Sequence, residues 1–237
     1  MSMDSDFVLP RLSKWRQKVF LTHATQVLEA QQQMSTQEGG NILHYTLRDI
    51  PQHERFSHYP KGDRIDKSTG SQYFYHCHRE NLESTEHGHF HCFMRYKQIP
   101  KRIKPADLPD WDKYIENPMT HLIAIGMNQF GQPIRLFTVN RWVTSEIWYD
   151  AQHAPYFLKR YNMTLTDDPY WQVLDKWVEG LLRLFSPQIC WLHQERDKRM
   201  KAYQEKNPDA NPFIDHDIEE LSEIEIDLKK QIEWVIS

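Results

Sequence analysis

The stretches QYFYHCHR (residues 72–79) and EHGHFHCFMR (residues 86–95) decide the fold. Both are rich in aromatic residues and alternate in character with a period of two, the spacing that places side chains on opposite faces of a β-strand. The polar run ENLESTE (residues 80–86) between them is typical of a hairpin loop. We therefore expect an antiparallel hairpin with one histidine face and one largely apolar face, as in a sheet that covers a core on one side.

The histidines have the same parity within each strand. His76 and His78 share a face of the first strand, and His87, His89 and His91 share a face of the second. With the loop as read, His76 is expected opposite His89, and His78 opposite His87. An exposed polar face is an alternative, but five neutral imidazoles together would repel one another once protonated.

Imidazoles from facing strand positions can converge on one cation, because cross-strand Cβ atoms lie about 5 Å apart and metal–nitrogen bonds measure about 2.0–2.1 Å. His76, His89 and His91 are the preferred ligands, and His78, His87 and His121 are alternates. With no thiolate on this face, iron or zinc is the expected cofactor. Three histidines leave coordination positions open for water or substrate, which favours a hydrolase with zinc or an oxidoreductase with iron.

Other polar residues near the strands are candidates for moving protons and for holding a small-molecule substrate. Glu86 and His87 are the expected catalytic groups. Arginines bind anions in a bidentate manner, and an asparagine can orient a substrate, although both residue types also have structural roles. The expected substrate-binding residues are Tyr59, Arg95, Asn140 and Arg141.

The rest of the sequence predicts one α+β domain over residues 1–237, with an antiparallel sheet of hairpins flanked by N- and C-terminal helices. A second hairpin is expected from residues 120–127 and 133–143, and a loop over residues 51–70. The expected parts are an N-terminal helix over residues 11–34, a histidine-bearing sheet over 70–145, a helical hairpin over 165–205, and a C-terminal segment of short strand and helix over 213–237.

Composition excludes several classes of protein. The formal net charge is −4, which argues against a nucleic-acid or anionic-membrane binder. Aromatic residues make up 13% of the chain, too many for a disordered protein. Three cysteines, no signal peptide and no apolar membrane span predict a cytoplasmic protein. An exposed strand edge leaves a homodimer open.

Two further functions compete with a metalloenzyme. A metal-binding or sensor protein without catalysis would have saturated coordination, or ligands with no pocket beside them. The run HGHFHCF (residues 87–93) also resembles the histidine-triad signature of nucleotide hydrolases and transferases. That resemblance implies that His89 attacks a phosphorus atom without a metal, but Gly88 stands where the signature has a bulky apolar residue.

Longer runs resemble a bacterial family described only as a domain of unknown function. They are HYPKGDRIDKSTGSQYFYHCHR (residues 58–79), EHGHFHCFMR, THLIAIGMNQFGQPIRLFTVNRWVTSEIWY (residues 120–149) and the late LSEIEIDL (residues 221–228). The resemblance covers about residues 50–230. It implies a bacterial, intracellular protein and no particular activity, so function has to come from the chemistry of the histidines.

Overall fold

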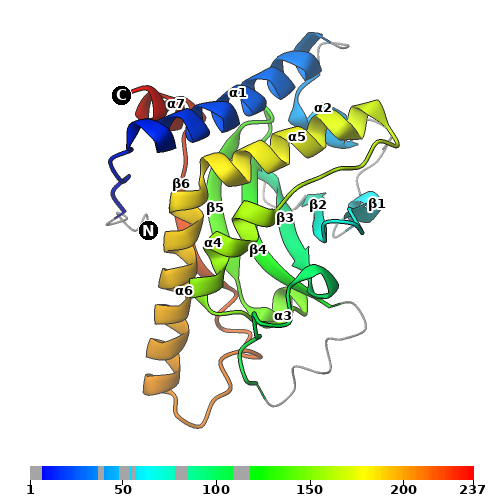
Figure 1. Ribbon diagram of the computed structural model, residues 1–237. Coiled ribbons are helices and arrows are strands. Elements are labelled where there is room, and N and C mark those ends of the chain that lie inside the picture. The colour runs from blue at the N-terminus through cyan, green and yellow to red at the C-terminus, as the bar shows by residue number, and fades with distance from the viewer. Residues whose placement is uncertain (1–6, 37–39, 48–53, 55–56, 78–84, 109–117) are drawn as a thin grey trace.

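The fold is built on one antiparallel sheet whose strands follow the order of the chain (Figure 1). The computed structural model describes residues 7–36, 40–47, 54, 57–77, 85–108 and 118–237. Within these residues each strand pairs with the next in the order β1-β2-β3-β4-β5-β6. The strands are β1 Tyr59–Ile65, β2 Ser71–Cys77, β3 Glu86–Arg95, β4 Met119–Asn128, β5 Pro133–Val139 and β6 Glu220–Glu225.

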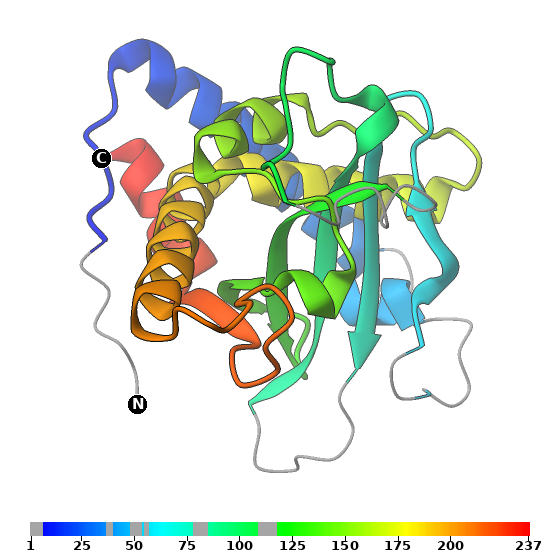
Figure 2. The ribbon, with the colours of Figure 1, turned by 90° about the horizontal axis from the view of Figure 1, so that it is seen from below.

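Helices precede and follow the sheet, and the predicted single α+β domain is confirmed. Figures 1 and 2 show the long helices α1, α5 and α6 gathered on one side of the strands. No helix in the described part of the chain is both long and apolar enough for a bilayer crossing. The α-helices are α1 Lys14–Thr36, α2 Ile42–Leu47, α3 Arg141–Thr144, α4 Ala154–Arg160, α5 Pro169–Leu184, α6 Ser186–Lys206 and α7 Leu228–Ile236.

One face of the sheet packs on these helices. The Phe90 ring lies 5.8 Å from the Trp177 ring of α5, centroid to centroid. Helix α5 begins with Pro169 in its first turn, and the side chain of Asp168 caps it by accepting a hydrogen bond from the Tyr170 N–H. The buried side chains on the helix-covered face are Tyr73, Tyr75, Cys77, Phe90, Cys92, Ile123 and Ile125.

The prediction of a loop over residues 51–70 is wrong for residues 59–65, which form strand β1. This strand lies at the edge of the sheet, where Pro60 can be accommodated because its missing N–H is not needed by a second neighbour. Its pairing with β2 shifts between Tyr59 and Arg64. Gly62 and Asp63 at that shift have φ of 81° and 63°. Proline and glycine, which read as loop signals, therefore form an irregular edge strand.

The predicted strand over residues 133–143 is too long. β5 ends at Val139, and Asn140 caps the short helix α3 by accepting a hydrogen bond from the Arg141 N–H. The sheet instead continues with β6, which pairs with β5 so that Leu136 lies opposite Ile224. The predicted short strand followed by a helix near the C-terminus is confirmed by β6 and α7.

Candidate metal centre

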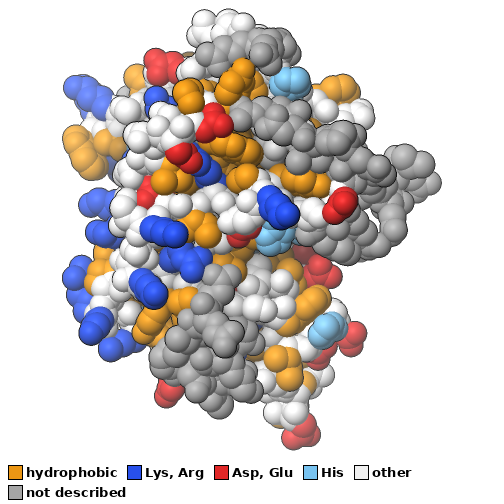
Figure 3. Space-filling model, turned by 90° about the vertical axis from the view of Figure 1, so that its right-hand side faces the viewer, with side chains coloured by type: hydrophobic (Ala, Val, Ile, Leu, Met, Phe, Trp, Pro, Cys, Tyr) orange, Lys and Arg blue, Asp and Glu red, His pale blue; other side chains and the backbone are white. Residues whose placement is uncertain are grey.

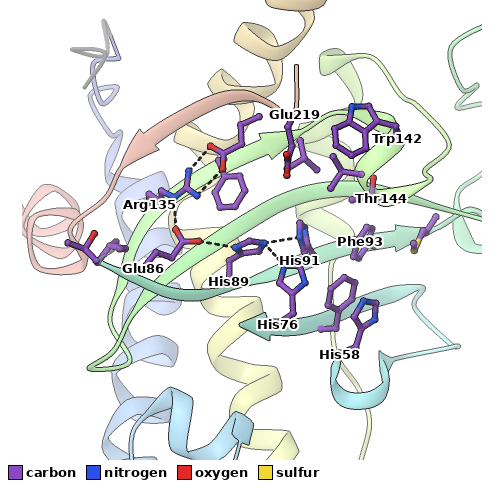
Figure 4. A pocket seen from close by; sticks show the side chains of 18 residues that line it. His58, His76, Glu86, His89, His91, Phe93, Arg135, Trp142, Thr144 and Glu219 are labelled. Atoms are coloured by element: carbon purple, nitrogen blue, oxygen red, sulfur yellow. Dashed lines mark hydrogen bonds and ion pairs between the residues drawn. The ribbon is translucent and has the colours of Figure 1, made fainter. Parts of the chain in front are cut away.

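Three imidazoles converge on the face of the sheet opposite the long helices (Figure 4). β2 and β3 pair with His76 opposite His89, as predicted. The Nε2 atom of His89 lies 2.6 Å from Nε2 of His76 and 3.1 Å from Nε2 of His91. Nitrogens bound to one ion at 2.0–2.1 Å in a tetrahedral arrangement lie about 3.3 Å apart. Small shifts of the rings would therefore give all three nitrogens bonding distances to one ion.

The orientation of His89 is fixed by a carboxylate. Nδ1 of His89 lies 2.9 Å from Oε1 of Glu86. Burial raises the pKa of Glu86, but hydrogen bonds from His89 and Arg135 outweigh it, so the net shift is downward. An ionised carboxylate can only accept, so His89 carries its proton on Nδ1 and presents the lone pair of Nε2 to His76 and His91.

His121 contacts His91. Nδ1 of His91 lies 3.0 Å from Nε2 of His121, so one of these two nitrogens donates a hydrogen bond to the other. The contact holds the ring of His91 in place beside His89.

The buried histidines of the cluster are held neutral. His91 is 2% exposed, and burial, followed by the neighbouring His89, His121 and His76, lowers its pKa well below the usual value. Burial, followed by Arg196 and His89, lowers the pKa of His121 to about 3. Neutral imidazoles are the form that binds metal ions, so the sheet holds His91 ready to coordinate.

A bulge at the start of β3 decides which side chains reach the cluster. The register against β4 shifts between Glu86 and Gly88. Glu86 therefore joins His89, whereas Nδ1 of His87 lies 2.7 Å from the hydroxyl of Tyr75, a core residue. The prediction that His87 shares the face of His89 is wrong, because simple alternation does not continue through a bulge.

Gly88 is required by the close approach of β2. A Cβ atom at this position would lie 2.3 Å from the backbone oxygen of His76 and 2.6 Å from the hydroxyl of Tyr75. Since backbone cannot move away without breaking the pairing that places His76 opposite His89, the glycine is part of the architecture of the cluster.

The cluster opens into a cavity of about 870 Å³. The three imidazoles lie beside apolar walls, with Glu86 and Arg135 at one end and Trp142 and Thr144 of α3 at the other (Figure 4). His58 stacks on Phe74 at the edge, with 3.6 Å between ring centroids. The remaining lining residues are Phe93, Thr85, Met119, Ile134, Phe137, Val139, Val143, Glu219 and Glu220.

The four residues expected to bind substrate do not line this cavity. The hydroxyl of Tyr59 accepts a hydrogen bond from the Glu54 N–H. The side-chain amide of Asn140 donates to the carbonyls of Pro212 and Ile218. Nε of the buried Arg141 donates to the carbonyl of Glu146.

Arg95 reaches the cavity only through other residues. It donates to Oε1 of Gln72 at 2.6 Å, and the amide nitrogen of Gln72 donates to Asp63 at 2.7 Å. The second carboxylate oxygen of Asp63 lies 2.8 Å from Nδ1 of His58. His78, predicted as a ligand, lies outside the described residues.

Among the cavity residues that were not predicted from the sequence, His58 and Arg135 lie closest to the predicted ones in kind. His58 directly precedes Tyr59, to which a site role was assigned, and the polar run around it was a usable signal. Arg135 had no such signal, because its partners are remote in sequence. Its guanidinium donates to Glu86 of β3 and to Glu220 of β6, at 2.5 and 2.7 Å.

The family model that matches the chain is a Domain of unknown function (DUF6969), and the match covers residues 21–226. The chain belongs to this family. This confirms the resemblance to an uncharacterised family, and the family description carries no activity. No curated protein and no solved structure gave a match to the chain.

Proposed function

We propose that the chain is a metal-dependent enzyme that binds one zinc or iron ion through His76, His89 and His91. The observation that carries the proposal is the convergence of three imidazole nitrogens, one of which, Nε2 of His89, is fixed as a lone-pair donor by Glu86. Hydrogen bonds from ligand imidazoles to a carboxylate or another acceptor are the usual second layer of a metal site.

The cavity favours catalysis over storage or sensing. Three protein ligands leave coordination positions open, and here they face a space large enough for a small molecule. A bound ion would polarise a substrate. Zinc would also activate water, and iron would activate dioxygen. Glu86 holds His89 in its tautomer, and we assign it a positioning role because both its oxygens already accept hydrogen bonds.

The first experiment measures metal content. Tag-free protein purified without chelator, and protein reconstituted anaerobically with Fe²⁺ or Zn²⁺, is analysed by mass spectrometry beside the variants His76→Ala, His89→Ala and His91→Ala. We expect about one equivalent of ion in the unaltered protein and a loss of at least tenfold in affinity in each variant. The matched control is His44→Ala, an exposed histidine of α2, which should retain the ion.

A second measurement tests for open coordination positions. The cobalt-substituted protein is titrated with azide while its visible spectrum is recorded. A spectral change indicates an exchangeable position and supports an enzyme, whereas an unchanged spectrum indicates saturated coordination and a storage or sensor role. Failure to bind any ion after reconstitution would contradict the metal centre, and the metal-free histidine-triad chemistry of His89 would become the better hypothesis.

A further inference from the structure

The positive charge that lines the cavity is already neutralised. Among the described lining residues, Arg135 is the one Lys or Arg. Its Nε donates to Glu86 at 2.5 Å, its Nη2 to Glu220 at 2.9 Å, and its Nη1 to both Glu220 and Glu223, at 2.7 and 3.2 Å. The guanidinium also lies 3.9 Å from the centroid of the Phe137 ring. With its N–H groups and one flat face in use, Arg135 offers little to an anionic substrate.

Carboxylates outnumber this single cation around the cavity. Glu86, Glu219 and Glu220 all line it. Glu219 is exposed, and Figure 4 shows its carboxylate turned into the cavity beside Trp142. A divalent ion on the histidines would offset the excess without reversing it. On the face of the molecule drawn in Figure 3, Lys and Arg side chains gather along the left edge, and acidic side chains lie at the lower right beside a histidine.

The walls next to the histidines are apolar. On one side the Phe74 and Phe93 rings stack with 5.6 Å between centroids, and Met119 completes the cluster. On the other side Phe137 meets the His89 ring edge to face at 5.0 Å. Val139 and Val143 extend this second wall. Aromatic and aliphatic walls of this kind stabilise a flat apolar body by burial of its surface.

We propose that the cavity takes a small molecule with a flat apolar body and no anionic group, placed between these two walls with its reactive end at the three histidines. The inference rests on the proposed function only for the position of the reactive end. Phosphorylated substrates, such as the nucleotides of histidine-triad enzymes, do not fit the inference, because the side chains of the cavity are net acidic and Arg135, the one Lys or Arg among its described lining residues, is already held by carboxylates.

The test uses three probes that share one ring and one chain and differ in charge: 3-phenylpropan-1-ol, 3-phenylpropylamine and 3-phenylpropionate. Each is titrated by calorimetry into the metal-free and the zinc-loaded protein. We expect the alcohol and the amine to bind roughly tenfold more tightly than the carboxylate in the metal-free form, where no ion can ligate the carboxylate. The comparison within one scaffold separates the effect of charge from that of apolar burial.

A charge reversal sharpens the test. In Glu219→Lys the cavity gains an ammonium group at an exposed position, so the fold is not at risk, and the affinity for 3-phenylpropionate should rise roughly tenfold. The matched control is Glu205→Lys, which makes the same change of net charge at an exposed position of α6 and should leave all three affinities unchanged.

Binding of 3-phenylpropionate to the unaltered metal-free protein as tight as that of the alcohol would overturn the inference. So would a failure of all three probes to bind. The inference and the proposed metal centre can fail separately. Zinc binding without discrimination between the probes would contradict only the substrate class, whereas discrimination by a protein that binds no ion would contradict only the metal centre.

Discussion

The two faces of the central sheet are built from the same strands and are buried in different ways. On the helix side, Phe90 and Cys92 are fully buried among apolar side chains. On the other side, their neighbours His89 and His91 are 7% and 2% exposed, although their polar atoms meet mainly other polar atoms. Burying a polar group is unfavourable unless it is hydrogen-bonded. Apolar residues in place of the histidines would therefore stabilise the fold more. The helix side is explained by its contribution to stability, and the histidine side by the metal site that we propose.

The largest expected effect on stability lies on the helix side. Phe90→Ala removes a ring that packs against Trp177, and the cavity left behind should lower the free energy of unfolding by about 3–5 kcal/mol. Urea denaturation measures this loss. The folded fraction should still bind one ion, because no ligand changes. Loss of the ion from folded Phe90→Ala protein would show that the two faces are not separable.

The next effect lies on the histidine side. Glu86→Gln removes the charge that fixes the tautomer of His89 while it keeps the size of the side chain, so the affinity for the ion should fall about 10–100-fold. Competition with a chromophoric chelator measures the dissociation constant. Glu225→Gln makes the same substitution on β6, at a residue that does not line the cavity, and serves as control. Equal affinities of Glu86→Gln and the unaltered protein would rule out a positioning role for this carboxylate.

The pH dependence of stability gives a test of the histidine side, through the buried His121. The unfolded chain protonates His121 near pH 6.5, whereas the folded protein does so only at about 3, because burial and then Arg196 and His89 lower this pKa. Between these values the unfolded state binds one more proton, so stability falls as the pH falls, by about 1.4 kcal/mol per pH unit for this group.

Urea denaturation of the metal-free protein between pH 6 and 4 measures this slope. In His121→Gln, whose side-chain amide can still pair with Nδ1 of His91, the slope should be smaller by the amount that the uptake of one proton contributes. Parallel pH profiles of the variant and the unaltered protein would contradict the lowered pKa of His121 in the folded protein.

The smallest effect on stability is expected when one of the proposed ligands is replaced in the metal-free protein. His76 is half-buried, and His76→Ala should change the free energy of unfolding of the metal-free protein by only about 1 kcal/mol or less. The same substitution should remove most of the stabilisation that zinc gives the unaltered protein, as measured by thermal melts with and without zinc. A large loss of stability without zinc would indicate that this face is structural.

Alternation predicted the two faces for most of both strands, and the assumed length of the hairpin loop predicted the pairing of His76 with His89. Prediction failed where a local irregularity interrupts alternation. The bulge between Glu86 and Gly88 turns His87 toward Tyr75. The irregularity at Gly62 and Asp63 made the sequence of β1 resemble a loop. A period of two does not reveal where an extra residue enters a strand.

Other parts of the site depend on contacts that no local pattern encodes. Arg135 meets Glu86 and Glu220, which are 49 and 85 residues away in the chain. Arg95 and Asn140 were read as substrate contacts because their chemistry allows it, but tertiary structure directs them to Gln72 and to the carbonyls of Pro212 and Ile218. Residue type therefore predicted the three converging histidines, whose spacing is local, better than it predicted the residues around them.

The order of the strands also has a consequence for how the protein assembles. β2 to β5 pair with chain neighbours across connections of modest length, whereas β6 joins β5 only after the 80 residues from Asn140 to Glu219, which include α4, α5 and α6, have been placed. Contacts between segments remote in sequence form late, because a long loop must close first. Since β6 supplies Glu220 to Arg135, and Arg135 holds Glu86 against His89, we expect the imidazoles to reach their final arrangement only when the end of the chain has docked.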